Sequence, residues 1–210
     1  MSTPHVLLVN GSPHREGCTY TALKEVADTL EANGVSTEIL WLGIKPIAPC
    51  VACWSCRTNG RCIRKDDIVS TLVDKMEQAD GLILGSPVHF AAASGQLTTA
   101  CDRLFLSDAS LFRGKPGAAV VSCRRGGAAA AFDQLNKYFT GSNMPVVTTP
   151  YWNMVHGLTP EEVRRDEEGM QTMRALGRNM AWLLKCIVAG KEQGHTFPES
   201  EPPVFTNFIR

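Results

Sequence analysis

The sequence predicts an α/β fold in which helices cover both faces of one parallel sheet. Short apolar runs alternate with segments of helical periodicity about five times between His5 and Val147. Because these runs are apolar throughout, they are typical of parallel strands, which lie between two helix layers and need crossover connections. A chain of 210 residues, 44% of them hydrophobic, can bury the core of one such domain.

The first part of the chain predicts two strands with a helix between them. The run from His5 to Val9 is the first strand, and residues 35–42 alternate in hydropathy as a second strand does. Gly34 stands where a C-terminal helix cap belongs. The intervening helix places these apolar residues on one face: Ala22, Leu23, Val26, Ala27 and Leu30.

The middle of the chain predicts three more strands and the helices that connect them. A helix begins near Asp66 or Asp67, since either can cap it. The third strand covers Gly81 to Leu84, and a helix through residues 97–104 follows it. The remaining elements are a fourth strand at 117–122, an alanine-rich helix through 132–138, and a fifth strand beginning at 145–147.

A helical extension follows the predicted sheet. Thr159 caps it, Pro160 occupies its first position, and Glu162 completes a capping box. The apolar face of this helical region ends near Gly190, and residues 191–210 are rich in Pro and aromatic residues without periodicity. We therefore expect one domain over 1–190, with an inserted loop at 48–67, and an extended arm over 191–210. Phe205 and Phe208 predict that the arm lies against a partner subunit.

Charge and composition exclude some classes of function. The formal net charge is zero and no run of Lys or Arg occurs, so a nucleic-acid partner is not expected. The N-terminus has only four consecutive apolar residues, too few for a signal peptide or a membrane span. We expect no membrane association and a cytoplasmic location, where thiols stay reduced and clustered cysteines serve metal or redox chemistry.

Four cysteines form the most specific motif in the chain. Cys50, Cys53, Cys56 and Cys62 are spaced C-x2-C-x2-C-x5-C. Compact spacing of this kind is typical of iron–sulfur ligation, whereas structural zinc sites usually split their ligands into two separated pairs. The sequence favours a 4Fe–4S cluster, with a zinc site and unmetallated thiols as the alternatives.

The loop after the first strand has the composition of an anion-binding loop. Gly11 and Gly17 permit tight turns, while the hydroxyls of Ser12 and Thr19 and the start of the following helix favour an anion. His14 and Arg15 can add positive charge, and Cys18 precedes Thr19. The loop lacks the dinucleotide fingerprint and the Walker lysine, so a terminal monophosphate fits better than a pyrophosphate. The alternative is an ordinary turn between strand and helix.

Two further loops at the same sheet edge have the residues needed to line a flat ring. One contains Pro87, Val88, His89 and Phe90, and the other contains Ser122, Arg124, Arg125, Gly126 and Gly127. Each loop alone is equally consistent with a helix start that has solvated polar residues. Together with the first loop they predict FMN, because a doubly wound sheet binds its ligand at the carboxyl ends of its strands. Five strands with a phosphate loop after the first predict the flavodoxin-like strand order 2-1-3-4-5.

On these motifs the chain resembles the flavodoxin-like NAD(P)H-dependent FMN reductases, and among them the iron–sulfur flavoproteins. The resemblance covers most of residues 5–190 and rests on Gly11–Thr19, the cysteine run with Ile63–Asp67, Gly85–Leu97 and Tyr151–Gly157. It implies a 4Fe–4S cluster on the four cysteines, and a dimer or tetramer in which flavin and cluster approach across an interface. The family's loop usually has Arg at the position of His14, and Asn or Ser at that of Cys18.

The sequence thus predicts an FMN-dependent oxidoreductase that moves electrons between NAD(P)H or a reduced carrier and an acceptor through a 4Fe–4S cluster. We expect a small-molecule or protein redox partner, and no side chain is assigned as an acid–base catalyst. The alternatives are a non-catalytic electron carrier, a plain FMN or quinone reductase without a cluster, and a redox or oxygen sensor.

Overall fold

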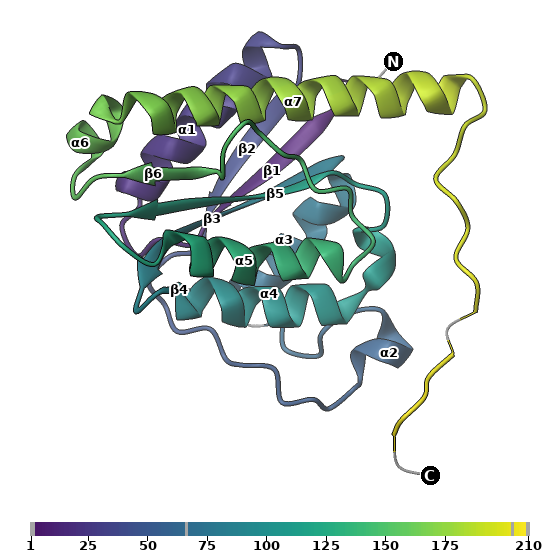
Figure 1. Cartoon of the computed structure of the whole chain (residues 1–210). Helices are drawn as coiled ribbons and strands as arrows, with labels where there is room; N and C mark the ends of the chain where they lie inside the picture. The colour runs from purple at the N-terminus through teal and green to yellow at the C-terminus, as the bar shows by residue number, and fades with distance from the viewer. Residues whose placement is uncertain (1–2, 66, 203, 209–210) are drawn as a thin grey trace.

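The computed structural model describes residues 3–65, 67–202 and 204–208, and its centre is a parallel sheet (Figure 1). The parallel strands lie in the order β2-β1-β3-β5-β6. When the short antiparallel strand β4 is set aside, this is the predicted order 2-1-3-4-5. The strands are β1 (His5–Asn10), β2 (Ser36–Trp41), β3 (Gly81–His89), β4 (Ala92–Ala93), β5 (Gly117–Cys123) and β6 (Met154–His156).

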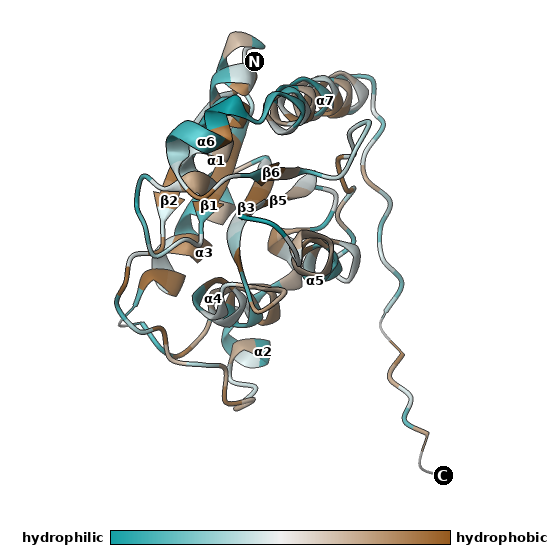
Figure 2. Ribbon diagram, turned by 60° about the vertical axis from the view of Figure 1, so that its left-hand side comes forward, coloured by the Kyte–Doolittle hydropathy of each residue, from teal (hydrophilic) through white to brown (hydrophobic). Residues whose placement is uncertain are grey.

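Helices cover both faces of the sheet, as predicted (Figure 2). On one face lie α1 (Cys18–Ala32), α6 (Pro160–Arg165) and α7 (Glu167–Glu192). On the other lie α3 (Ile68–Gln78), α4 (Gly95–Ser107) and α5 (Ala128–Thr140). A short helix, α2 (Cys56–Asn59), belongs to the cysteine loop, and the 3-10 helix η1 (Ala109–Leu111) follows α4.

The alternation of side chains along the strands divides the hydrophobic core in two. In β1, Leu7 and Val9 face the α3, α4 and α5 layer, whereas Val6 and Leu8 face α1 and α7. All four side chains are at most 1% exposed. Because both faces are covered, β1, β3 and β5 are buried along most of their length, whereas no residue of the edge strand β2 is fully buried.

The fifth strand was predicted at the wrong place. Val146 makes only an isolated bridge with Gly117, and the chain then leaves the sheet. Pro150, which has no N–H to donate to a ladder, lies in this excursion. The excursion is closed by a 2.7 Å hydrogen bond from the Thr149 hydroxyl to Asn153 Oδ1. The chain rejoins the sheet as β6, where Val155 pairs with Ser122 of β5.

The third strand is longer than predicted and folds back on itself. It continues past Leu84 to His89, and β4 pairs with it so that Val88 faces Ala93 and His89 faces Ala92. Phe90 and Ala91 form the turn with φ values of 50° and 58°. A two-residue hairpin turn of this kind needs positive φ at both central residues, and neither residue is a glycine that would have signalled it.

The predicted helix caps are observed, with one change of partner. Asp67 caps α3 by accepting from Val69 N–H at 3.1 Å, while Asp66 lies outside the described residues. Thr159 caps α6 by accepting from Glu162 N–H at 3.3 Å. The Glu162 carboxylate accepts from Leu158 N–H at 2.6 Å, one residue earlier than a capping box requires.

The longest helix, α7, is followed by the extended arm. It has 26 residues and ends at Glu192, and the described residues from 195 onward form no helix or strand. In Figure 1 this segment runs from the end of α7 past the α4 and α2 side of the molecule. Within the described residues, no helix is both long and apolar enough to cross a bilayer.

Candidate functional site

The loop between β1 and α1 is held in shape by the side chain of Asn10. This buried residue ends β1; its Oδ1 accepts from Ser12 N–H at 3.0 Å, and its Nδ2 donates to the Arg15 carbonyl at 3.0 Å. The Ser12 hydroxyl accepts from His14 N–H at 3.1 Å. Among the described residues no side chain caps the start of α1, so the amides of its first turn can meet an anion. The loop therefore fits a phosphate group.

Hydrogen bonds join this loop to the two strands beside it. Gly11 N–H donates to the Gly85 carbonyl of β3 at 2.9 Å. The hydroxyl oxygens of Thr19 and Ser122 lie 2.8 Å apart in a buried contact between α1 and β5. The Ser94 hydroxyl, at the start of α4, donates to the Gly11 carbonyl at 2.7 Å. The carboxyl ends of β1, β3 and β5 thus form one connected edge.

His14 and Cys18 lie along an open groove beside the loop. The groove has a volume of about 630 Å³, and Trp41, Leu158 and Pro160 also line it. Trp41 Nε1 donates to the Ser12 carbonyl at 2.8 Å, which fixes one wall of the groove against the loop. Burial raises the pKa of the Cys18 thiol, and the nearby Glu162 and Glu161 carboxylates raise it further. Cys18 is therefore a neutral side chain in this groove.

The hairpin and the loop after β5 pack against each other. A side chain at Gly127, where φ is 89°, would lie 2.7 Å from Ala91 Cα and 3.0 Å from Val88 Cγ1. Only a residue without Cβ permits this approach. The structure therefore brings together the two segments that were predicted to line a ring.

The predicted site residues at this edge differ in exposure. Ser12, Thr19 and Ser122 are buried. Cys18, Pro87, Val88 and Gly127 are partly buried. The exposed members, which are available to a ligand or to solvent, are His14, His89, Phe90, Arg124, Arg125 and Gly126. The Phe90 ring is fully exposed at the tip of the hairpin.

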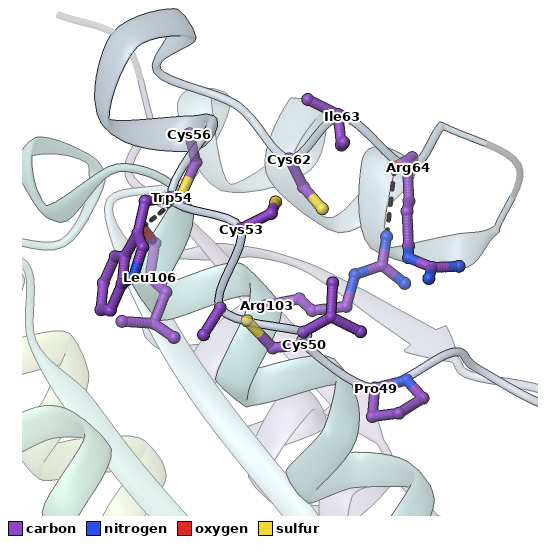
Figure 3. A pocket seen from close by; sticks show the side chains of 12 residues that line it. Pro49, Cys50, Cys53, Trp54, Cys56, Cys62, Ile63, Arg64, Arg103 and Leu106 are labelled. Carbon is purple, nitrogen blue, oxygen red and sulfur yellow. Dashed lines mark hydrogen bonds between the residues drawn. The ribbon is translucent and has the colours of Figure 1, made fainter.

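The four cysteines of the predicted metal site line a second cavity, on the α4 side of the molecule. Figure 3 shows Cys50, Cys53, Cys56 and Cys62 arranged around it. Its volume is about 220 Å³, and Val51, Trp54, Ile63 and Leu106 supply apolar walls. The chain turns sharply between the cysteines, because Ala52 and Trp54 have φ values of 50° and 59°.

The four thiols of this cavity are a donor set that can hold an iron–sulfur cluster. All four cysteines are free thiols. Hydrogen bonds from the Ser55 amide and hydroxyl lower the pKa of the Cys53 thiol and favour the thiolate that metals bind. Within the described residues, no three Cys, His, Asp or Glu side chains are close enough to hold one ion.

A buried arginine, Arg103 of α4, supports the cysteine loop. Its Nη1 donates to the Ala48 carbonyl at 3.2 Å, and its Nη2 donates to the Arg64 carbonyl at 3.1 Å. Nη1 also forms an ion pair with Asp67. These partners lie at the two ends of the loop predicted at 48–67, so one side chain ties both ends to α4.

Sequence reasoning missed Asn10, Trp41, Ser94 and Arg103. Asn10 had a usable signal, since a polar residue that ends a buried strand at the ligand-binding edge is a candidate for shaping the loop that follows. Ser94 also had one, because it precedes a predicted helix as a cap does. Trp41 and Arg103 had none, because an amphipathic pattern does not show which long side chains fold inward.

Sequence comparisons find a family model and related proteins that match this chain. The profile of the family described as NADPH-dependent FMN reductase matches residues 4–159. An iron–sulfur flavoprotein of Methanocaldococcus jannaschii is 35% identical over 190 residues, which cover 87% of this chain and 98% of that protein.

Solved structures show the same fold at low sequence identity. An NAD(P)H:quinone oxidoreductase from Methanothermobacter marburgensis superposes with a TM-score of 0.64 at 18% identity, covering 85% of this chain and 98% of that one. A flavodoxin from the domain Archaea gives a TM-score of 0.58 at 16% identity, covering 87% and 99%. With a profile match over most of the chain and a close full-length relative, this protein belongs to the NADPH-dependent FMN reductase family, in the branch of the iron–sulfur flavoproteins.

Proposed function

We propose that this protein moves electrons between NAD(P)H or a reduced carrier and an acceptor, with FMN at the edge of the sheet and a 4Fe–4S cluster on Cys50, Cys53, Cys56 and Cys62. The observation that carries the proposal is the meeting of the Ser12–Thr19 loop, the β3–β4 hairpin and the loop after β5 at one edge. The cavity lined by all four cysteines supports the second cofactor.

The loop after β1 would hold the phosphate of FMN. Backbone amides at the start of α1 and the hydroxyl of Ser12 are the donors, while His14 and Arg15 add positive charge beside them. Thr19 is committed to Ser122, so its part is to fix the loop against β5. These donors include no Walker lysine, so the loop is better suited to a monophosphate than to a pyrophosphate.

The hairpin and the loop after β5 would flank the flavin ring. The exposed Phe90 offers an apolar surface beside the ring, and Arg124 and Arg125 place positive charge at the same edge. Positive charge there favours an anionic ring. When bound, FMN supplies the conversion between two-electron and one-electron transfer. The role of these residues is to orient the ring and leave one face open to a donor or acceptor.

The cysteine loop would hold a one-electron cofactor near the surface. Cys50 and Cys53 are exposed, and Cys56 and Cys62 are partly buried, so the cavity opens to the exterior. A thiolate-bound cluster supplies single-electron transfer. Its position near the surface suits exchange with a separate redox partner or with a second subunit.

Replacing Cys56 with Ala tests the two cofactors separately. Anaerobically prepared protein should hold about four iron per chain, and Cys56→Ala should lose most of that iron. FMN should remain, because the residues proposed to bind it lie in other loops. Iron analysis and the flavin absorption spectrum measure both, and Cys186→Ala, at an exposed cysteine of α7, is the matched control.

Steady-state kinetics separates an enzyme from an electron carrier. The proposed function predicts catalytic turnover of NADH or NADPH with quinone or flavin acceptors. Reduction only by a protein donor would favour the non-catalytic carrier instead. Wild-type protein that binds FMN but no iron after anaerobic reconstitution would reduce the proposal to a plain FMN reductase.

A further inference from the structure

Arg103 is buried beneath the cysteine cavity, which is unusual for an arginine. Its side chain is 1% exposed, and it is the largest of the fully buried side chains in the described part of the chain. It occupies the inward face of α4 together with Ala100 and Leu104. Arginine is almost never fully buried unless its charge is paired, so neighbouring groups must offset the cost of removing the guanidinium from water.

The hydrogen bonds of Arg103 do not use its Nε–H. Nη1 and Nη2 contact the Ala48 and Arg64 carbonyls and Asp67, but buried Nε has no partner among the described residues. A buried N–H without an acceptor is costly, and native proteins rarely retain one. An acceptor that arrives with a ligand would satisfy it.

The same side chain forms part of the cavity that the four cysteines line. Figure 3 shows Arg103 below Cys53 and Cys62, with its guanidinium next to the Arg64 backbone. Asp67, its ionic partner, does not line the cavity. The other cation of the lining, Arg64, is exposed and therefore screened by solvent. A ligand in the cavity would meet the positive charge of Arg103 at closer range than the carboxylate.

We propose that Arg103 tunes the cluster: its buried charge and its free Nε–H stabilise the additional negative charge of the reduced cluster. This inference rests on the cluster of the proposed function. Four thiolates make the site net negative, and the added electron makes it more so. A buried cation favours the more negative state, and a hydrogen bond to a cluster sulfur acts in the same direction. Arg103 thereby raises the reduction potential of the cluster.

Two substitutions on the ion pair should shift the potential in opposite directions. Arg103→Gln removes the charge, so at a fixed potential the ratio of reduced to oxidised cluster should fall about tenfold, which is about 59 mV for a one-electron couple. Asp67→Asn removes the opposing charge and should raise that ratio, while Asn can still cap α3. Redox titration followed by the electron paramagnetic resonance of the reduced cluster measures both.

Control variants separate a tuning role from a structural one. Arg61→Gln, at an exposed arginine of the same loop that pairs with Asp74 and Glu77, should leave the potential unchanged. Arg103→Lys keeps the charge but loses the Nε–H, so it should lower the potential by less than Arg103→Gln does. If Arg103 served only as structural support, iron loading would fall in its variants while the loaded fraction kept its potential.

The outcomes distinguish this inference from the proposed function. Wild-type protein without iron after anaerobic reconstitution would overturn both. If wild-type protein holds the cluster but Arg103→Gln leaves the potential unchanged, the tuning role alone is overturned. Shifts of the same sign in Arg103→Gln and Asp67→Asn would also overturn it. If Arg103→Gln does not hold iron, Asp67→Asn decides the matter: a raised potential supports the inference, and an unchanged or lowered one rejects it.

Discussion

Ser12 is a buried residue whose backbone and side chain are both engaged in shaping the loop after β1. Its amide is bound by Asn10 and its hydroxyl accepts from His14 N–H. A carboxylate at this position would stand where we propose the phosphate to bind, and two like charges at short range repel strongly in a partly buried site. The position is therefore a sensitive test of the proposed FMN site.

Ser12→Asp should yield protein without bound flavin. Flavin content after purification, and after incubation with added FMN, measures the effect. Ser200→Asp, at an exposed position of the arm, adds the same charge far from the loop and should leave flavin content unchanged. Full flavin content in Ser12→Asp would place the site elsewhere.

The sequence alone could identify residues whose role follows from residue type and spacing. It missed those whose role depends on where the side chain points in the folded protein. The hydroxyls of the first loop and the four cysteines are visible from residue type and spacing. The pairing of Thr19 with Ser122 is not, because the two are 103 positions apart in the chain and meet only when α1 packs on β5. From the sequence, Arg103 is likewise expected to be an exposed helix residue, because only the folded cysteine loop covers it.

The β3–β4 hairpin and the loop after β5 pack against each other at Gly127. Gly127 has positive φ and lies within contact of Ala91, whereas adjacent Gly126 has open space around its Cβ position. The packing therefore requires glycine at position 127, whereas position 126 has room for a side chain.

Gly127→Ala should destabilise the protein and weaken FMN binding. Backbone strain together with displacement of the hairpin should cost about 1–3 kcal/mol in the free energy of unfolding, measured by urea denaturation. Gly126→Ala should lie within about 0.5 kcal/mol of wild type. Equal effects of the two substitutions would contradict the packing of the hairpin against this loop.

Strands and helices with strong patterns were predictable, and elements that depend on distant partners were not. The apolar run of β1 and the cap of α3 at Asp67 are local signals, and both predictions were confirmed. The short strand β6 has only three residues and exists because β5 offers a free edge. The turn at Phe90 and Ala91 carries none of the Asn or Gly residues that usually mark such hairpins.

At the scale of the whole molecule, apolar side chains remain uncovered on the described surface. Phe205 and Phe208 of the arm are 81% and 103% exposed, and Tyr151, Trp152 and Trp182 are each at least half exposed. The Arg57 guanidinium lies 5.8 Å from the centre of the Phe205 ring, so the arm passes the cysteine loop. An arm whose aromatic side chains are this exposed is a candidate for packing on a second copy of the chain.

A chain that ends at Glu199 should associate less strongly than the full chain. It keeps Phe197, which packs beside Gly114, and removes the exposed aromatic residues beyond it. Sedimentation velocity over a range of concentrations should show an oligomer for the full chain and a larger monomer fraction for the truncated one. Thermal unfolding of the core serves as the control, and a full chain that is monomeric throughout would rule out this role of the arm.

The ties from Arg103 to both ends of the cysteine loop have a consequence for the order in which the protein is assembled. Closing a loop costs conformational entropy, and in zinc fingers the metal must offset that cost, so the apoprotein is unfolded. Here Ala48, Arg64 and Asp67 are already bound to α4 by protein groups alone. Folding can therefore precede metallation, and the cluster that we propose would be delivered at a late step, to a chain that has already folded.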